Sequence, residues 1–255
     1  MSSSTFLFKF NRYKHLLISE WHQTKYTMLI VYGSIIGVMF LTLILQLFSS
    51  SRIDSPYNTE SMASTLTIMA IIFGSLCFIE LAKTPSRQNY LSIPASALEK
   101  LISKWTMMAI IIPISYIAFF SIFSWISPPI VQLFTAQDII VKPLDFTMIL
   151  EMLPPMILIQ CIYILGSIWK PSYSIIKTTF SLFLLVISIG LITFLFVRVV
   201  YYDLFDGFVM NGNHISVKFP FEDLIQSKLF RYLIGIGIFL TIMAASLFKL
   251  REKEI

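Results

Sequence analysis

Long apolar segments separated by short polar ones dominate the hydrophobic pattern of this chain. Six of them are nearly free of charged residues, and they cover about 27–48, 62–80, 105–126, 146–169, 178–197 and 231–248. A helix needs roughly 17–25 apolar residues to cross a bilayer, and it satisfies its own backbone hydrogen bonds in lipid. The pattern therefore predicts an all-α membrane protein whose transmembrane domain, residues 27–248, has six transmembrane helices.

The first 26 residues are amphipathic rather than uniformly apolar. Phe6, Phe10, Tyr13 and Leu17 recur at helical spacing, while the basic residues lie off that line. Two arrangements fit this pattern: an amphipathic helix lying in the membrane interface, or a short helix packed on the bundle. We expect the first, a cytoplasmic interfacial helix over 1–26 that precedes the first span.

A carboxylate, two prolines and two glycines interrupt the apolar segments. Glu151 lies close to Pro154 and Pro155, which predicts either a helix broken at a gating or substrate-path residue or a shorter helix that begins at the prolines. We favour the shorter helix, with Glu151 above it at the interface. Gly33 and Gly37 match the small-xxx-small motif, which predicts close helix packing within the bundle or across a dimer.

The polar segment 84–104, which we call the insert, has the pattern of a short helix. Pro94 suits a helix start because it has no backbone donor. Alternatively, Ser96 caps the helix with Glu99 as its third residue, which forms a capping box. Such a helix has two faces. The apolar face holds Leu98, Leu101, Ile102 and Trp105, and the polar face holds Glu99, Lys100, Ser103 and Lys104.

Composition and charge agree with a membrane protein and indicate its orientation. The chain is 56% hydrophobic and 13% charged, against roughly 25% charged in soluble domains. With the N-terminus inside, 13 of the 19 Lys and Arg residues lie on the cytoplasmic side, which predicts two cytoplasmic termini, a cytoplasmic insert, an external loop at 198–230 and a cytoplasmic tail at 249–255. No long basic run indicates a nucleic-acid partner. Cys77 and Cys161 lie in apolar runs and are expected to be buried and unpaired.

The motifs of common catalytic and energy-coupling sites are missing from the sequence. No phosphate-binding GxxxxGK[ST] loop occurs, and no apolar segment holds a histidine. The three histidines show no metal-ligand spacing, and the spans hold almost no ionisable residue for a coupled ion. We therefore expect neither an enzyme nor a bound cofactor or metal, and we expect the energy for any transport to come from a partner.

Two segments and the layout resemble type-2 ABC transporter permeases, the membrane subunits of bacterial ABC exporters. The segment RQNYLSIPASALEKLISKW at 87–105 resembles the family's loop after the second span, roughly Y-L-x-L-P-x-S-x-x-E-K-x-x-x-K. The segment FKFNRYKHLLISEWHQTKYTMLI at 8–30 resembles the N-terminal helix of small bacterial permeases of this family. The resemblance implies that the insert docks on an ATPase. The positions it assigns to this coupling are Arg87, Gln88, Asn89, Tyr90, Leu91, Pro94, Ser96, Glu99 and Lys100.

The resemblance further implies an export permease of the bacterial inner membrane. Its partners would be a separate cytoplasmic ABC ATPase, which uses the ATP, a second copy or paralogue that completes a dimer, and membrane lipid. Many such permeases carry an external domain or helical hairpin between the fifth and sixth spans, whereas 198–230 offers only a short helix from Pro220. The alternative reading is a non-transporting integral membrane protein, such as an assembly, immunity or sensor subunit.

Overall fold

The computed structural model describes residues 8–49, 53–54, 58–134, 139–140, 144–200, 205–206, 209–210 and 227–254. The protein is predominantly helical in this part. In chain order the helices are α1 (Phe10–Ser49), α2 (Thr59–Leu76), α3 (Thr84–Leu91), α4 (Ala97–Thr106), α5 (Ile112–Phe134), α6 (Phe146–Trp169), α7 (Ser174–Val200) and α9 (Lys228–Glu252). A 3₁₀ turn, η2 (Ile79–Ala82), follows α2, and a π-helical turn, η3 (Met107–Ile111), joins α4 to α5.

Four strands of two residues each occur in the connections. They are β1 (Ile53–Asp54), which pairs in parallel with β2 (Ile139–Ile140), and β3 (Phe205–Asp206), which pairs antiparallel with β4 (Val209–Met210). Such short pairs tie loops together and form no sheet layer.

Six helices of the described chain are long and apolar enough to cross a membrane. They run over Phe10–Thr42, Thr59–Leu76, Ala97–Ser127, Phe146–Trp169, Ser174–Val200 and Phe230–Glu252. The all-α class and the number of six apolar helices are thus confirmed. Most of the external loop expected at 198–230, including the short helix expected from Pro220, lies outside the described residues.

Two expected boundaries between helices do not exist in the structure. The N-terminal helix and the first span form one continuous helix, α1, because no Gly or Pro lies near the expected boundary at residues 26–27. The insert helix α4 likewise continues through η3 into α5, whereas the sequence pattern predicted a third span beginning at Trp105. The second span is shifted toward the N-terminus from the expected 62–80, because α2 begins at Thr59 and ends at Leu76, where η2 follows.

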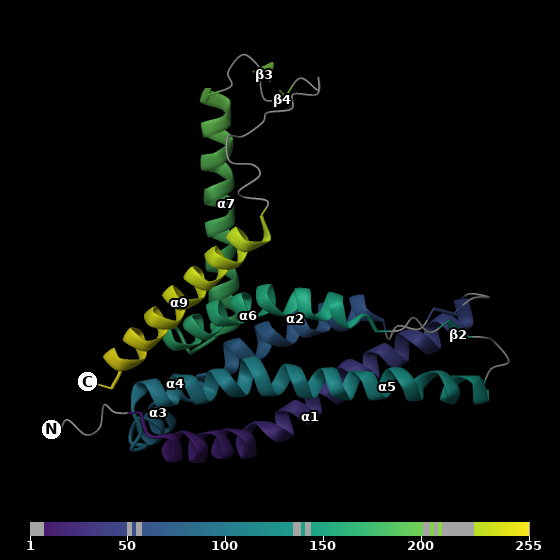
Figure 1. The fold of residues 1–255 in the computed structure, drawn as a ribbon, viewed down its shortest axis with the longest axis horizontal. Helices are drawn as coiled ribbons and strands as arrows, with labels where there is room; N and C mark the ends of the chain where they lie inside the picture. Colours follow the sequence, from purple (N-terminus) through teal and green to yellow (C-terminus); the bar gives the residue numbers. More distant parts are fainter. Residues whose placement is uncertain are drawn as a thin grey trace.

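The connections gather at two opposite ends of the layer formed by α1, α2, α5 and α6 (Figure 1). At one end the start of α1, the insert and the end of α9 meet. At the other end β1 pairs with β2, and the Asp145 backbone N–H donates to Thr59 Oγ1 at 2.9 Å. The segments predicted to be cytoplasmic therefore share one end, and the connections after α1 and α5 share the other.

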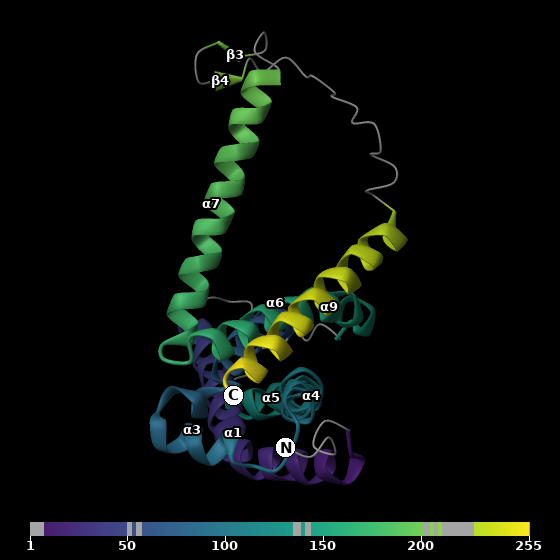
Figure 2. The ribbon, with the colours of Figure 1, turned by 90° about the vertical axis from the view of Figure 1, so that its left-hand side faces the viewer.

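Helix α7 stands apart from this layer, and α9 leaves it obliquely (Figure 2). After Ser174 no residue of α7 is buried, and its apolar side chains cover every side of the helix. A helix that is apolar all round belongs in lipid or in an interface with another protein. The described chain therefore leaves a large apolar surface on α7 uncovered.

The core of the layer lies between α2, α5 and α6. Met62, Phe73, Tyr116 and Phe120 are fully buried there. Gly74 sits where α2 meets α6, and a Cβ at this position would lie 3.0 Å from Tyr163 Cβ. Cys77 and Cys161 are buried and unpaired, as the sequence predicted.

Candidate functional site

The insert folds as two helices, α3 and α4, and its second helix has the predicted capping box. Ser96 Oγ accepts from the Glu99 backbone N–H at 3.2 Å, and the Ser96 backbone N–H donates to Glu99 Oε2 at 2.8 Å. Two donors that a helix start leaves unpaired are thereby satisfied. Of the two predicted helix starts, the one at Ser96 is confirmed, and Pro94 lies in the turn between α3 and α4.

The polar face of α4 is buried. Glu99 is 0% exposed, and Lys100, Ser103 and Lys104 are each 1% exposed. On the apolar face Leu101 is also buried, Ile102 and Trp105 are half-buried, and Leu98 is 38% exposed. A surface helix in water ordinarily exposes its polar face. We call the four residues Tyr90, Glu99, Lys100 and Lys104 the anchor, because their side chains join the insert to the rest of the chain.

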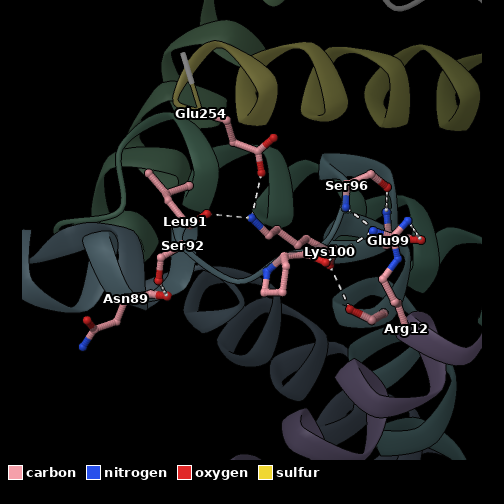
Figure 3. Close-up of polar contacts among 10 residues, drawn as sticks. Arg12, Asn89, Leu91, Ser92, Ser96, Glu99, Lys100 and Glu254 are labelled. Carbon is pink, nitrogen blue, oxygen red and sulfur yellow. Dashed lines mark hydrogen bonds and ion pairs between the residues drawn. The ribbon is translucent and has the colours of Figure 1, made fainter. Parts of the chain in front are cut away.

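Glu99 joins α4 to the start of α1. Its Oε1 accepts the Lys9 backbone N–H at 2.6 Å and lies 3.4 Å from Arg12 Nη2 (Figure 3). Arg12 Nη1 also donates to the Pro94 carbonyl oxygen at 3.4 Å. One carboxylate therefore caps its own helix and holds the N-terminal segment against it.

Lys100 joins α4 to the end of α3 and to the C-terminal segment. Its Nζ donates to the Leu91 carbonyl oxygen at 3.2 Å and to Glu254 Oε1 at 2.9 Å (Figure 3). Nearby, Lys253 Nζ donates to the Ile168 carbonyl oxygen at the end of α6. Burial lowers the pKa of Lys253, and the neighbouring cations Arg87 and Lys249 lower it further.

Lys104 joins α4 to α1 and to the exit of α2. Its Nζ lies 3.1 Å from Glu20 Oε2 and 2.7 Å from Glu80 Oε1, so one buried ammonium bridges two carboxylates. Glu20 comes from the first third of α1, and Glu80 comes from η2. Charges that are buried this completely occur only where they are paired and hydrogen-bonded.

Tyr90 provides an aromatic surface beneath both lysines. Lys100 Nζ lies 5.6 Å and Lys104 Nζ 5.2 Å from the centre of its ring, and Phe78 meets the same ring edge-on. Both distances fall within the range of cation–π attraction. Burial raises the pKa of the Tyr90 hydroxyl well above its ordinary value, with a further contribution from Glu20, so the ring stays neutral.

These contacts fasten one short helix to four other parts of the chain. A buried ion pair adds little net stability over an apolar pair, because desolvation offsets the attraction, but losing one partner is costly. Such a network fixes orientation: it specifies where α4 lies relative to α1, η2, α3 and the end of α9. A force applied to the insert would therefore reach several apolar helices together.

The residues assigned to ATPase coupling fall into three groups by exposure. The exposed group is Arg87, Gln88, Asn89 and Pro94, the half-buried group is Leu91 and Ser96, and the buried group is Tyr90, Glu99 and Lys100. Only the first two groups can meet another protein. The buried three belong to the anchor and hold the insert in place.

The residues assigned to gating lie on the outside of the described chain. Glu151, Pro154 and Pro155 are all exposed, and α6 runs through both prolines without a break. The prediction that the fourth span begins at the prolines is wrong. Asp145 starts the helix instead, because its side chain accepts the backbone N–H groups of Thr147 and Met148.

The glycines assigned to helix packing lie at no close helix contact in the described chain. A Cβ at Gly33 or Gly37 would find no atom within 4 Å in the described chain, so helix packing at this motif, within the bundle or across a dimer, stays a prediction. Two glycines of the described chain lie at close helix contacts. They are Gly74, where a Cβ would lie 3.0 Å from Tyr163 Cβ, and Gly166, where it would clash with the Thr178 side chain. Gly74 follows Ala70 at the same spacing as in the Gly33–Gly37 pair, so the motif does not distinguish the two sites.

Sequence reasoning missed the partners of the anchor, which are Glu20, Glu80 and Glu254, and it gave Lys104 no role. A usable signal did exist, since Glu80 and Lys104 flank neighbouring apolar segments on the same side of the membrane. Ionisable residues at such positions tend to pair with each other. The contact of Lys104 with Glu20 could not be predicted from the sequence, because the two residues lie 84 positions apart.

No group of His, Cys, Asp and Glu residues in the described part of the chain could hold a metal ion. Comparison of the chain with protein-family models, with curated proteins and with solved structures gives no match in any of the three. The function therefore has to be argued from the anchor and the six apolar helices.

Proposed function

We propose that this chain is the membrane subunit of an ABC-type exporter, driven by a separate cytoplasmic ATPase that docks on the insert. One observation carries the proposal. The insert exposes Arg87, Gln88 and Asn89 on α3 while its buried polar face is fastened to α1, η2 and α9. A segment with one free face and one firmly attached face suits a protein that receives movement from a partner.

Movement would pass from the ATPase to α3 and then to the spans through the anchor. ATP binding draws the two ATPase subunits together and shifts the insert. Since Lys104 bridges Glu20 and Glu80, this shift acts on α1 and on the exit of α2 at once. Lys100 carries it to the end of α9 through Glu254.

The proposed site is the inner membrane of a bacterium, with both termini and the insert in the cytoplasm. The charge bias of the sequence supports this orientation. The direct contacts of Lys9 with Glu99 and of Glu254 with Lys100 support a shared side for the two termini.

The working unit in this proposal is a dimer of two copies or of two paralogues. The uncovered apolar surface of α7 and the exposed Gly33 and Gly37 on α1 support a partner within the membrane. The nearly uncharged spans favour a lipophilic or amphipathic substrate.

The test is whether an ATPase binds the insert. The protein should be purified from its native membrane in mild detergent, and associated proteins should be assayed for ATP hydrolysis. We expect an ATPase to co-purify, and Arg87→Glu on exposed α3 should weaken that association. Lys170→Glu, an exposed charge reversal after α6, is the control. A preparation without any associated ATPase would favour the non-transporting alternative.

A further inference from the structure

The helix that carries the insert into the third span contains a π-helical turn with an unusual backbone carbonyl. In η3 the Ile112 backbone N–H donates to the Met107 carbonyl oxygen instead of to Met108. The π-helical donor for Met108 would be residue 113, which is a proline and has no N–H. The Met108 carbonyl therefore lacks both its α-helical and its π-helical donor.

Gln160 of α6 supplies the missing donor. Its Nε2 donates to the Met108 carbonyl oxygen at 2.7 Å, and the residue is 0% exposed. Gly74 allows this arrangement, because a Cβ there would lie 3.1 Å from the Gln160 carbonyl oxygen. A small cavity lies beside the contact, lined in part by Met69, Ala70 and Pro113.

The two sides of η3 are held by different parts of the protein. On one side the anchor ties α4 to α1, η2 and α9. On the other side Tyr116 and Phe120 of α5 are fully buried, and Tyr32 Oη of α1 donates to the Ile112 carbonyl oxygen at 2.9 Å. Any movement of α4 relative to α5 must therefore concentrate in the five residues Met107–Ile111.

We propose that η3 is a hinge between the insert and the third span, and that Gln160 is the residue that positions it. The hinge has two registers. In the present one Gln160 holds Met108. In a regular α-helix the Ile112 backbone N–H would donate to the Met108 carbonyl oxygen. The Ala109 carbonyl would then lack a donor, because its α-helical donor would be residue 113, a proline. Gln160 thus has an acceptor in either register, and the exchange turns α4 about its own axis relative to α5.

This inference rests on the proposed function only for the force that moves the hinge. The hinge itself is a property of the isolated chain, and it can be tested without a partner. Gln160→Met removes the donor at similar volume, and Pro113→Ala restores the missing backbone N–H. Measured together, the two substitutions form a double-mutant cycle on the unfolding equilibrium in detergent.

We expect Gln160→Met alone to raise the unfolding equilibrium constant roughly fivefold or more, since a buried carbonyl loses its side-chain donor. In the Pro113→Ala background the same substitution should change it less than about twofold, because position 113 now supplies a donor. Pro154→Ala, which changes an exposed proline within α6, is the control background and should leave the full effect of Gln160→Met. Equal effects of Gln160→Met in all three backgrounds would overturn the pairing of Gln160 with Pro113.

Movement at the hinge is measured by spin labels on Leu98 of α4 and Ile122 of α5, which are both exposed. Pro113→Ala should shift the distance between the labels, and Gln160→Met should broaden its distribution. Unchanged distances in both variants would overturn the hinge. If an ATPase associates, ATP should alter the distance in the native protein and not in Pro113→Ala. If an ATPase binds but ATP changes the label distance equally in the native protein and in Pro113→Ala, the hinge alone is refuted. If no ATPase binds, the proposed function alone is refuted.

Discussion

Replacing the buried lysine of the anchor, Lys104→Met, tests the ionic attachment of the insert most sharply. Methionine is close to lysine in length and fits an apolar site, so the change removes the ammonium with little loss of volume. Glu20 and Glu80 would then face each other without the cation that now lies 3.1 Å and 2.7 Å from their oxygens.

The expected loss follows from these distances and from burial. At an effective dielectric constant near 20, two unit charges at these separations attract by about 5–6 kcal/mol per pair. Desolvation of the lysine offsets much of this gain in the native protein. Removing one partner of a buried pair nevertheless costs about 3–5 kcal/mol, because the remaining charge stays buried and unpaired.

The assay is reversible unfolding in mixed micelles followed by tryptophan fluorescence. The matched control is Lys83→Met, an exposed lysine beside the insert, which should change the free energy of unfolding by no more than about 0.5 kcal/mol. Adding Glu20→Gln to Lys104→Met should restore at least about 1 kcal/mol by removing one unpaired carboxylate. A loss for Lys104→Met equal to that of the control would refute the buried ionic attachment.

Three further predictions concern the helices around the site. Gly74→Ala should destabilise the protein by about 1–3 kcal/mol, because the new Cβ would lie 3.0 Å from Tyr163 Cβ. Gly33→Ala should stabilise it by up to about 1 kcal/mol, because alanine favours a helix and its Cβ would meet no atom within 4 Å. Chemical unfolding of both variants measures the two effects. Tyr173 has a φ of 59° in the turn after α6, so Tyr173→Gly should raise the free energy of unfolding by about 1 kcal/mol, and a loss of stability would contradict this strain. Hydrogen bonds from the Thr147 hydroxyl and backbone N–H lower the pKa of Asp145. The contribution of Asp145 to the free energy of unfolding is therefore complete above about pH 4, and it is lost as the pH falls through the lowered pKa. Asp145→Asn should remove this part of the acid dependence in a pH titration of stability.

The start of the insert helix could be predicted from the sequence, but the direction of its polar face could not. A capping box is a local pattern, and Ser96 and Glu99 fall at its two positions. Which face is buried depends on partners from distant segments: Arg12 and Glu20 come from α1, and Glu254 comes from the chain end. Periodicity predicts two faces and gives no information about their partners.

The number of apolar helices was also predictable, because hydropathy is a local property of the sequence. The ends of these helices and their contacts were not predictable. Hydropathy measures the length of an apolar run, and it is insensitive to whether the helix continues beyond it, as α4 does into α5. It is equally insensitive to which glycine meets another helix. A Cβ at Gly33 or Gly37 would meet no atom within 4 Å in the described chain, although the pair matches a packing motif. Ala70 and Gly74 match the same small-xxx-small motif, and Gly74 does lie at a close contact.

The most direct test of the central claim is a site-specific photocrosslink from the exposed surface of α3. A photoreactive residue should replace Gln88 on the insert and, as the control, exposed Ile122 on α5. In native membranes the probe at position 88 should capture a protein that binds and hydrolyses ATP, and the probe at position 122 should not. Capture of no ATPase from position 88, or equal capture from both positions, would contradict the proposal that an ATPase drives this chain through the insert.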